Sequence, residues 1–223
     1  MVSFDYQGNY RGIIMVKYMV FDFDGTLANS IELFIAGYND LAAKEGYREM
    51  KIEDIDLLKK MTIPERCRHL NFPMRSIPLA APKLYRYLRK SEKGLPFYPG
   101  IKDMLDQLNQ QGIKMAIISS NATDIIARSL KAHQIDYIED ILCSKHIFTK
   151  DKLMKKLMNK HRLKPSDVLY VGDEERDISA SKRAGIKVVW VAWGYDDETI
   201  ALKANPDYIA RQPSDVLATV ENI

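Results

Sequence analysis

The chain has 223 residues, of which 46% are hydrophobic and 28% charged. This composition is typical of a globular protein and excludes a disordered, collagenous or coiled-coil chain. The formal charge of +3 at pH 7 does not identify a partner. No apolar run is long enough to span a bilayer. The two cysteines, Cys67 and Cys143, are too few for a disulfide framework. We therefore expect a cytoplasmic protein with no membrane partner.

The first strand of the core is predicted at residues 17–23. Residues 1–14 are polar and rich in turn formers, and we expect them to be an extension outside the core. Residues 17–23 are β-branched and aromatic, and the loop after them begins with Asp22, Asp24, Gly25 and Thr26. Apolar residues at spacings of three and four then predict an amphipathic helix over 27–44.

A helical module follows this first βα unit. Between residues 47 and 98 the pattern consists of helical pieces separated by five prolines, with no convincing strand. We expect an inserted, small all-helical cap domain over residues 30–97. The α/β core domain then comprises residues 15–29 and 98–223.

The remainder of the chain alternates between helix and strand. The alternation predicts a parallel sheet with helices on both faces, a doubly wound α/β core with right-handed crossovers. The predicted helices are 101–111, 124–132, 151–161 and 174–184, and the predicted strands are 114–119, 140–143, 167–171, 187–191 and a short one near Tyr208.

Polar side chains follow the predicted strands where ligands bind in such sheets, beyond the carboxyl ends of the strands. Strand 114–119 leads into Ser119, Ser120 and Asn121, and strand 167–171 into Asp173 and Asp177. Lys150 begins the helix before the latter strand. Several carboxylates at one edge need a cation, and a few oxygen ligands suit Mg²⁺ completed by a substrate phosphate.

This set of groups suits phosphoryl transfer. Asp22, kept ionised by the cation, can attack phosphorus and become an aspartyl phosphate. Asp24 can protonate the leaving oxygen and later activate water. Ser119 and Lys150 can bind phosphoryl oxygens, and Gly25 allows close backbone approach. We expect further phosphate contacts from Thr26, Ser120 and Asn121.

Four segments resemble the motifs of the haloacid dehalogenase superfamily of phosphohydrolases, in the same order. They are residues 21–27 (FDFDGTL), 117–121 (IISSN), 148–150 (FTK) and 171–177 (VGDEERD). The resemblance covers residues 17 to 223, is greatest to the phosphoglycolate phosphatases, and implies that residues 30–97 form the family's helical cap. It also implies that Mg²⁺ is held by the carboxylates of Asp22 and Asp173 and the backbone carbonyl of Asp24, with Asp177 in support.

Several assignments stay open at this point. Ser120 is an alternative to Ser119 as the motif hydroxyl, and Lys152 is an alternative to Lys150. Asp177 is equally well explained as an exposed helix acid. A phosphomutase or phosphoryl transferase on the same core is an alternative to a hydrolase of small phosphorylated metabolites. The sequence does not decide between a monomer and a homodimer.

Residues 59–93 are strongly basic, with ten lysines and arginines against two glutamates. Most of these side chains are expected to be solvated, while one, such as Arg66, Arg68 or Arg75, is a candidate to bind the leaving group of an anionic substrate. A non-catalytic protein that uses this basic cap to bind nucleic acid or an acidic partner is a third hypothesis. Nucleic acid is disfavoured because few aromatic residues interleave with the charges.

Overall fold

The computed structural model describes residues 16–91, 93–144 and 146–223, and the expectation for residues 1–14 lies outside this part of the chain. Six strands form the sheet: β1 (Tyr18–Phe21), β2 (Lys114–Ser119), β3 (Ile138–Cys143), β4 (Val168–Gly172), β5 (Lys187–Val191) and β6 (Tyr208–Ala210). The α-helices are α1 (Ile31–Glu45), α2 (Ile55–Lys59), α3 (Ile63–His69), α4 (Ile77–Leu88), α5 (Ile101–Gln110), α6 (Thr123–Ala132), α7 (Lys150–His161), α8 (Glu175–Ala184), α9 (Glu198–Ala204) and α10 (Pro213–Glu221). Short 3₁₀ helices lie at Ile52–Asp54, Met74–Ser76 and Pro165–Asp167.

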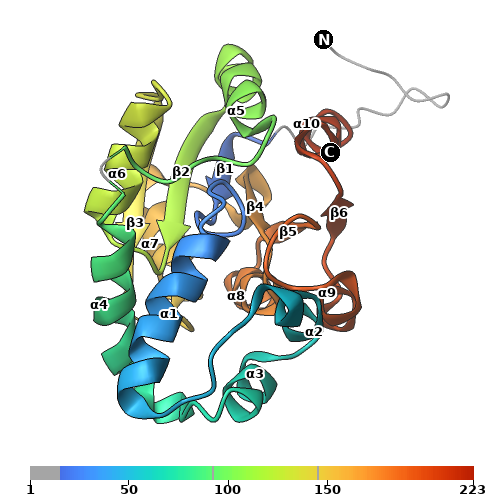
Figure 1. Cartoon of the computed structure of the whole chain (residues 1–223). Coiled ribbons are helices and arrows are strands. Elements are labelled where there is room, and N and C mark those ends of the chain that lie inside the picture. The colour runs from blue at the N-terminus through green and yellow to red at the C-terminus, as the bar shows by residue number, and fades with distance from the viewer. Residues whose placement is uncertain (1–15, 92, 145) are drawn as a thin grey trace, which may run out of the picture.

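All neighbouring strands in the sheet are parallel, in the order β3-β2-β1-β4-β5-β6. From β1 the chain proceeds outward to β2 and β3, and it then returns to the other side of β1 for β4, β5 and β6 (Figure 1). The direction of winding therefore reverses beside β1, which is where ligands bind in doubly wound sheets. The predicted doubly wound α/β core is confirmed.

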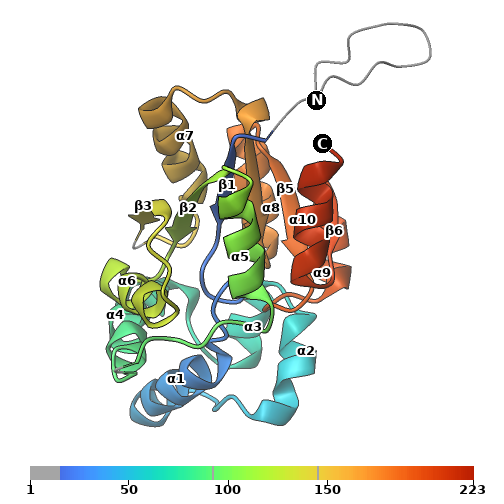
Figure 2. The same ribbon diagram turned by 90° about the horizontal axis from the view of Figure 1, so that it is seen from above.

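The two faces of the sheet are covered by different helices. Buried side chains of α5, α6 and α10 pack on one face with Met19, Phe21 and Ile117. Those of α7, α8 and α9 pack on the other with Val20 and Trp190. Seen from above, α5 and α10 lie on the opposite side of the sheet from α7 and α8 (Figure 2). Strands buried on both faces explain the nearly continuous apolar runs in the sequence.

Helices α1 to α4 lie together beyond one end of the sheet (Figures 1 and 2). We call residues 31–91 the cap. The cap has a hydrophobic cluster of its own, which includes Ile35, Tyr38, Leu58 and Leu70. The two connections between cap and core run side by side, because Ala28 bridges to Phe97 and the Asn29 amide donates to the Pro96 carbonyl. The domain boundaries at residues 30 and 97 remain a prediction.

Some predicted boundaries were wrong. The helix expected over 27–44 begins only at Ile31, because Leu27 and Ala28 are buried in the loop and Ala28 forms bridges to Asp24 and Phe97. The strand expected at 140–143 starts two residues earlier, at Ile138. Helices α9 and α10 were not predicted; they have seven and nine residues, too few for the apolar spacing to establish a helical period.

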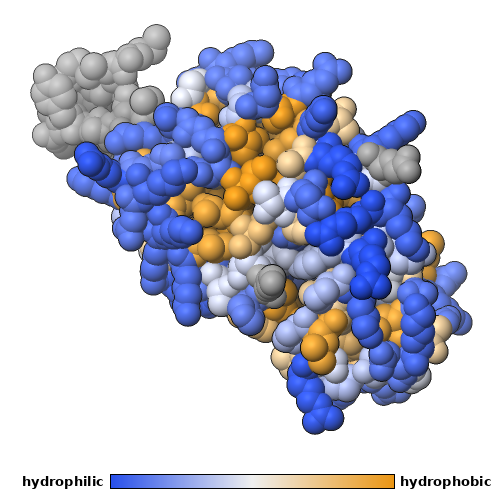
Figure 3. Space-filling view, turned by 90° about the vertical axis from the view of Figure 1, so that its left-hand side faces the viewer, coloured by the Kyte–Doolittle hydropathy of each residue, from blue (hydrophilic) through white to orange (hydrophobic). Residues whose placement is uncertain are grey.

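On the side of the molecule that carries β3, hydrophobic residues are exposed between hydrophilic ones (Figure 3). Five of the six residues of this edge strand are half-buried. Within the described residues, no helix has the length and apolar character needed to span a bilayer.

Candidate active site

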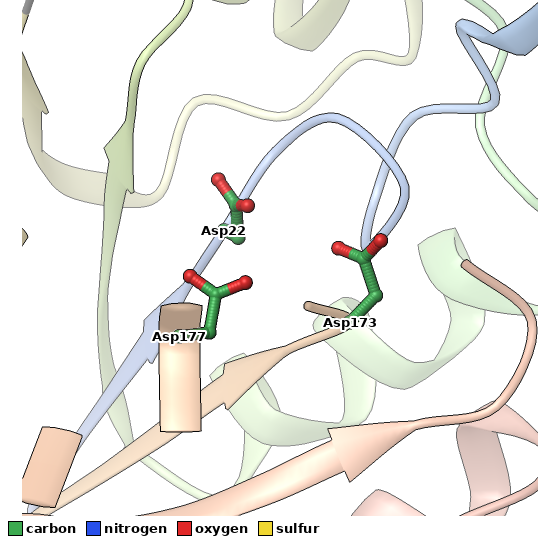
Figure 4. Close-up of side chains that lie close together, drawn as sticks. All are labelled: Asp22, Asp173 and Asp177. Atoms are coloured by element: carbon green, nitrogen blue, oxygen red, sulfur yellow. The ribbon is translucent and has the colours of Figure 1, made fainter. Parts of the chain in front are cut away.

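Three buried carboxylates meet where β1 and β4 end. Asp22 follows β1, Asp173 follows β4, and Asp177 lies in the first turn of α8 (Figure 4). Each offers an oxygen atom, and these oxygens all lie within 4.8 Å of one another. The side chain of Asp177 is inaccessible to solvent, which contradicts its interpretation as an exposed helix acid.

Lys150 lies inside this acidic cluster. Its ammonium Nζ is 2.5 Å from Asp22 Oδ2 and 2.5 Å from Asp177 Oδ1, and only 2% of the side chain is exposed. Lys152, two residues further along α7, is exposed. The helix therefore brings Lys150, and not Lys152, to the carboxylates. The hydroxyl of Tyr170 also donates to Asp177 Oδ1, at 3.1 Å.

Burial changes the protonation of these groups. It raises the pKa of Asp22 to about 7, although the neighbouring Lys150 ammonium acts in the opposite direction. It also raises the pKa of Asp173 well above its usual value, with Glu174 and Asp22 adding repulsion. Burial alone would lower the pKa of Lys150, but Asp177 and Asp22 together raise it. The cluster thus has more acids than Lys150 can neutralise.

Asp24 is held separately, by donors from two parts of the chain. Ser30 Oγ donates to Asp24 Oδ1 at 2.7 Å, and Asn121 Nδ2 lies 2.8 Å from Oδ2. Ser30 has one hydroxyl proton, so the Tyr195 hydroxyl, 2.6 Å away, donates to Ser30. Burial raises the pKa of Asp24, while the bonds from Ser30 and Asn121 lower it. These contacts fix the orientation of the Asp24 carboxyl group.

Among the predicted phosphate-binding residues, two side chains position acids, and two serines lie where β2 ends. The Thr26 hydroxyl donates to Asp173 Oδ1 at 2.8 Å, and the Asn121 amide holds Asp24, so both side chains position acids. Ser119 is buried at the end of β2, and its Oγ accepts from the Asn121 backbone N–H at 3.0 Å. The adjacent Ser120 is half-buried, and its backbone carbonyl accepts from the Tyr85 hydroxyl.

Two glycines leave room for Asp173. Gly25 has a φ of +81°, and a Cβ there would lie 2.2 Å from Asp173 Oδ2. A Cβ on Gly194 would lie 2.1 Å from the Asp173 Cβ. The backbone N–H of Tyr195, next in the chain, donates to Asp173 Oδ2 at 2.7 Å. Loops after β1 and β5 therefore fix Asp173 from both sides, and any side chain at either glycine would displace it.

Ion pairs that the sequence did not reveal surround this centre. Arg176 binds Glu174 and also donates to the Ile147 carbonyl at 3.1 Å. Burial would raise the pKa of Glu174, but Arg176 lowers it overall. The spacing of Glu174 and Arg176 in the fourth motif was the available signal.

Arg66 connects the cap to the core. Its guanidinium binds Asp196 and donates to the Leu58 carbonyl at 2.8 Å and the Tyr195 carbonyl at 3.1 Å. These contacts use the Nε and Nη2 groups of Arg66, and the binding of a leaving group by Arg66 stays a prediction. Arg68 and Arg75, the other two candidates, are exposed.

A cavity of about 260 Å³ separates the cap from this centre. Its core side is formed by Asp24, Ser120, Ile147, Glu174, Arg176 and Tyr195. The cap contributes mainly hydrophobic side chains, among them Phe34, Leu58, Phe72, Ala81 and Leu84. Asp22 and Lys150 are not part of this wall, so Asp24 is the one predicted catalytic carboxylate that borders the cavity.

The donor set fits a hard divalent cation. Three buried carboxylates with one ammonium leave an excess of negative charge, and burying such charge without a counterion is costly. Carboxylate oxygens in small number are the ligands that Mg²⁺ prefers, and among the residues that the structure describes no sulfur or imidazole ligand joins this cluster.

Comparison with known proteins gives a consistent result. The family model of the haloacid dehalogenase-like hydrolases matches residues 19–191. A phosphoglycolate phosphatase from Synechococcus elongatus is 28% identical over 92% of this chain and 97% of its own. The pyrophosphatase PpaX from Halalkalibacterium halodurans is 26% identical over 92% and 97%. A predicted phosphatase from Clostridium acetobutylicum has a similar fold, with a TM-score of 0.78, 20% identity and coverage of 94% and 100%.

Proposed function

This chain belongs to the haloacid dehalogenase-like hydrolases, and we propose that it hydrolyses small phosphate monoesters in a Mg²⁺-dependent reaction, through a phosphorylated Asp22. One observation carries the proposal. The Asp22 carboxylate lies beside the Lys150 ammonium and within the acidic cluster, while Asp24, two residues on, faces the cavity. A nucleophile and a proton donor therefore lie two residues apart in the chain, in different surroundings.

The metal would be held by the carboxylates of Asp22, Asp173 and Asp177. When bound, Mg²⁺ neutralises charge on these acids and on a phosphoryl group. The backbone carbonyl of Asp24 is a further candidate ligand. Asp173 is already fixed by the Thr26 hydroxyl and the Tyr195 N–H, so its orientation does not depend on the cation.

The first half-reaction uses the two aspartates in turn. The Asp22 carboxylate attacks phosphorus and forms a P–O bond, while the bond from phosphorus to the leaving oxygen breaks. Asp24 gives its proton to that oxygen, and the alcohol departs. The raised pKa of Asp24 favours the protonated form that this step needs. Lys150 offsets negative charge at Asp22 as the phosphoryl group approaches.

The second half-reaction returns the enzyme to its starting state. Asp24, now ionised, removes a proton from a water molecule as that water attacks phosphorus. The bond between Asp22 and phosphorus breaks, and inorganic phosphate is released. The bonds from Ser30 and Asn121 hold the Asp24 carboxyl group in place in both steps.

The names of the relatives support phosphoester or phosphoanhydride substrates. Phosphoglycolate and inorganic pyrophosphate are therefore the first compounds to assay, in a panel that also includes sugar phosphates and nucleoside monophosphates. With Mg²⁺, inorganic phosphate should be released from at least one compound without a bisphosphorylated activator.

The blank for this assay is the Asp22→Asn variant, and the matched control is Asp136→Asn, which alters an exposed aspartate before β3. We expect Asp22→Asn to lose turnover by at least about 10³-fold and Asp136→Asn to retain it. Substantial turnover in a folded Asp22→Asn protein, or no phosphate release from any compound by the unaltered protein, would contradict the proposal.

A further inference from the structure

The cavity between cap and core lies on the leaving-group side of the proposed reaction. Asp24, the group that would protonate the leaving oxygen, borders the cavity, whereas Asp22 does not. A phosphoryl group bound beside the paired Asp22 and Lys150 would therefore direct its alcohol portion past Asp24 into this space. The chemistry of the cavity wall then selects the alcohol, and this reasoning rests on the proposed function.

Most of the wall is hydrophobic. The cap contributes Phe34, Leu58, Phe72, Ala81 and Leu84, together with other apolar side chains. Tyrosines add ring surface without adding free hydroxyl groups. The Tyr38 hydroxyl donates to the Arg48 carbonyl, that of Tyr85 to the Ser120 carbonyl, and that of Tyr195 to Ser30.

The guanidinium groups at the cavity already have partners. Arg176 binds Glu174 and the Ile147 carbonyl. Arg66 binds Asp196 and two backbone carbonyls. Lys59, half-buried at the end of α2, is the cation of the described wall for which no ion pair is seen. A carboxylate entering this space would lose water, and each arginine already neutralises a carboxylate of the protein, so burying a further negative charge there is unfavourable.

The volume suits a ring. Apolar cavities of about 150 Å³ bind benzene, and this one measures about 260 Å³. Burial of apolar ligand surface against such a wall is favourable. We propose that the preferred substrates are phosphate monoesters of apolar, ring-sized primary alcohols, in preference to esters of charged or polyhydroxylated alcohols such as glycolate or sugars.

Two phosphonates that cannot be hydrolysed test the preference without depending on turnover. 2-Phenylethylphosphonate corresponds to benzyl phosphate and 3-phosphonopropionate to phosphoglycolate, so the pair differs only in phenyl against carboxylate. Calorimetry with Mg²⁺ should give a Kd for the phenyl compound at least about tenfold lower. Equal affinity, or tighter binding of the carboxylate, would overturn the inference. Loss of that tighter carboxylate binding in Lys59→Met would assign the carboxylate to Lys59.

The rate of turnover gives a second test of the substrate preference. Benzyl phosphate should have a higher kcat/KM than 2-phosphoglycolate or glycerol phosphate, all of which are esters of alkyl alcohols, so that differences in leaving-group acidity stay small. If phosphate is released but phosphoglycolate is preferred, the inference fails and the proposed function stands. If no ester turns over, the proposed function fails, and the phosphonate affinities still decide whether the cavity selects apolar groups.

A cavity-filling variant locates the effect. Ala81→Leu on α4 adds bulk to the cavity wall, whereas Ala43→Leu makes the same change at an exposed position on α1 outside it. Ala81→Leu should weaken binding of the phenyl compound about tenfold and leave that of methylphosphonate unchanged. Ala43→Leu should change neither. Unchanged phenyl binding in a folded Ala81→Leu protein would place the ring elsewhere, and the comparison in the unaltered protein stands whether or not this variant folds.

Discussion

The two sides of the cavity are built in opposite ways. On the core side, most side chains are charged or polar, and Asp24, Glu174, Arg176 and Tyr195 are held by named partners, as Asp24 is by Ser30 and Asn121. On the cap side the wall is largely apolar and has few directional contacts. Directional bonds fix the groups that make and break bonds to within fractions of an ångström, while apolar packing accepts a range of shapes. The core side therefore determines the reaction and the cap side determines the size and polarity of the substrate.

Asp24→Asn provides the most severe test of this division. The amide keeps the size of the side chain but can neither give nor accept the proton, so turnover should fall by about 10³-fold. Binding of 2-phenylethylphosphonate should change little, because the cap wall is intact. A single-turnover assay and calorimetry measure the two effects. If Asp24→Asn lost affinity but kept its rate, the division between the two sides would be wrong.

Lys150→Met should lower turnover by about 10²-fold, because Asp22 and Asp177 lose their shared cation. The same change leaves two buried carboxylates without it, and the free energy of unfolding should fall by about 3 kcal/mol. Lys152→Met, at an exposed position on the same helix, is the matched control and should alter neither quantity. Equal effects of the two substitutions on denaturant unfolding and on turnover would contradict the proposed role of Lys150 in the site.

Mg²⁺ should stabilise the protein more at pH 8 than at pH 6. In the metal-free protein the pKa of Asp22 is raised from 3.8 to about 7. The folded state therefore binds more protons than the unfolded state between these values, and stability from this group falls as pH rises through that window. A cation needs the ionised carboxylates, so its affinity rises with pH.

Thermal melting at matched ionic strength measures this difference. At a Mg²⁺ concentration about 100-fold above the Kd at pH 8, the free energy of unfolding at pH 8 should rise by about 2.7 kcal/mol. Asp173→Asn should remove most of the gain at both pH values, since that residue supplies one of the three oxygens. A larger stabilisation at pH 6 than at pH 8 would contradict metal binding by these carboxylates.

The smallest effect is expected at the contact between cap and core. Arg66→Met leaves Asp196 without its partner, and burial has already raised the pKa of Asp196 to about 6, with repulsion from Glu174. The free energy of unfolding should fall by about 2 kcal/mol. Arg68→Met, at an exposed position on the same helix, should have no measurable effect. No loss of stability in Arg66→Met would show that this pair contributes nothing to holding the cap.

The sequence predicted the parts of the site that follow from strand ends. In a parallel sheet the carboxyl ends of the strands share one edge, so Asp22, Ser119 and Asp173 could be placed together from local patterns alone. Asp177 stayed ambiguous, since burial of a helix position depends on what packs against it. The pair of Arg66 and Asp196 joins residues 130 positions apart and has no local signature.

The cavity could not be predicted either. Apolar residues of the cap, such as Leu58 and Leu84, have the same helical spacing whether they fill a core or line a space. Tyr195 was missed for a related reason. Its backbone N–H binds Asp173 and its hydroxyl binds Ser30, and both contacts depend on a loop conformation that no short motif encodes.

Chemical trapping of the phosphorylated enzyme tests the central claim most directly. Acid quenching during turnover of the best substrate, followed by peptide mass spectrometry, should find a phosphoryl group on the peptide that contains Asp22. The phosphorylated peptide should be absent in Asp22→Asn. Turnover by the unaltered protein without a phosphorylated Asp22, or with the phosphoryl group on another residue, would contradict the account.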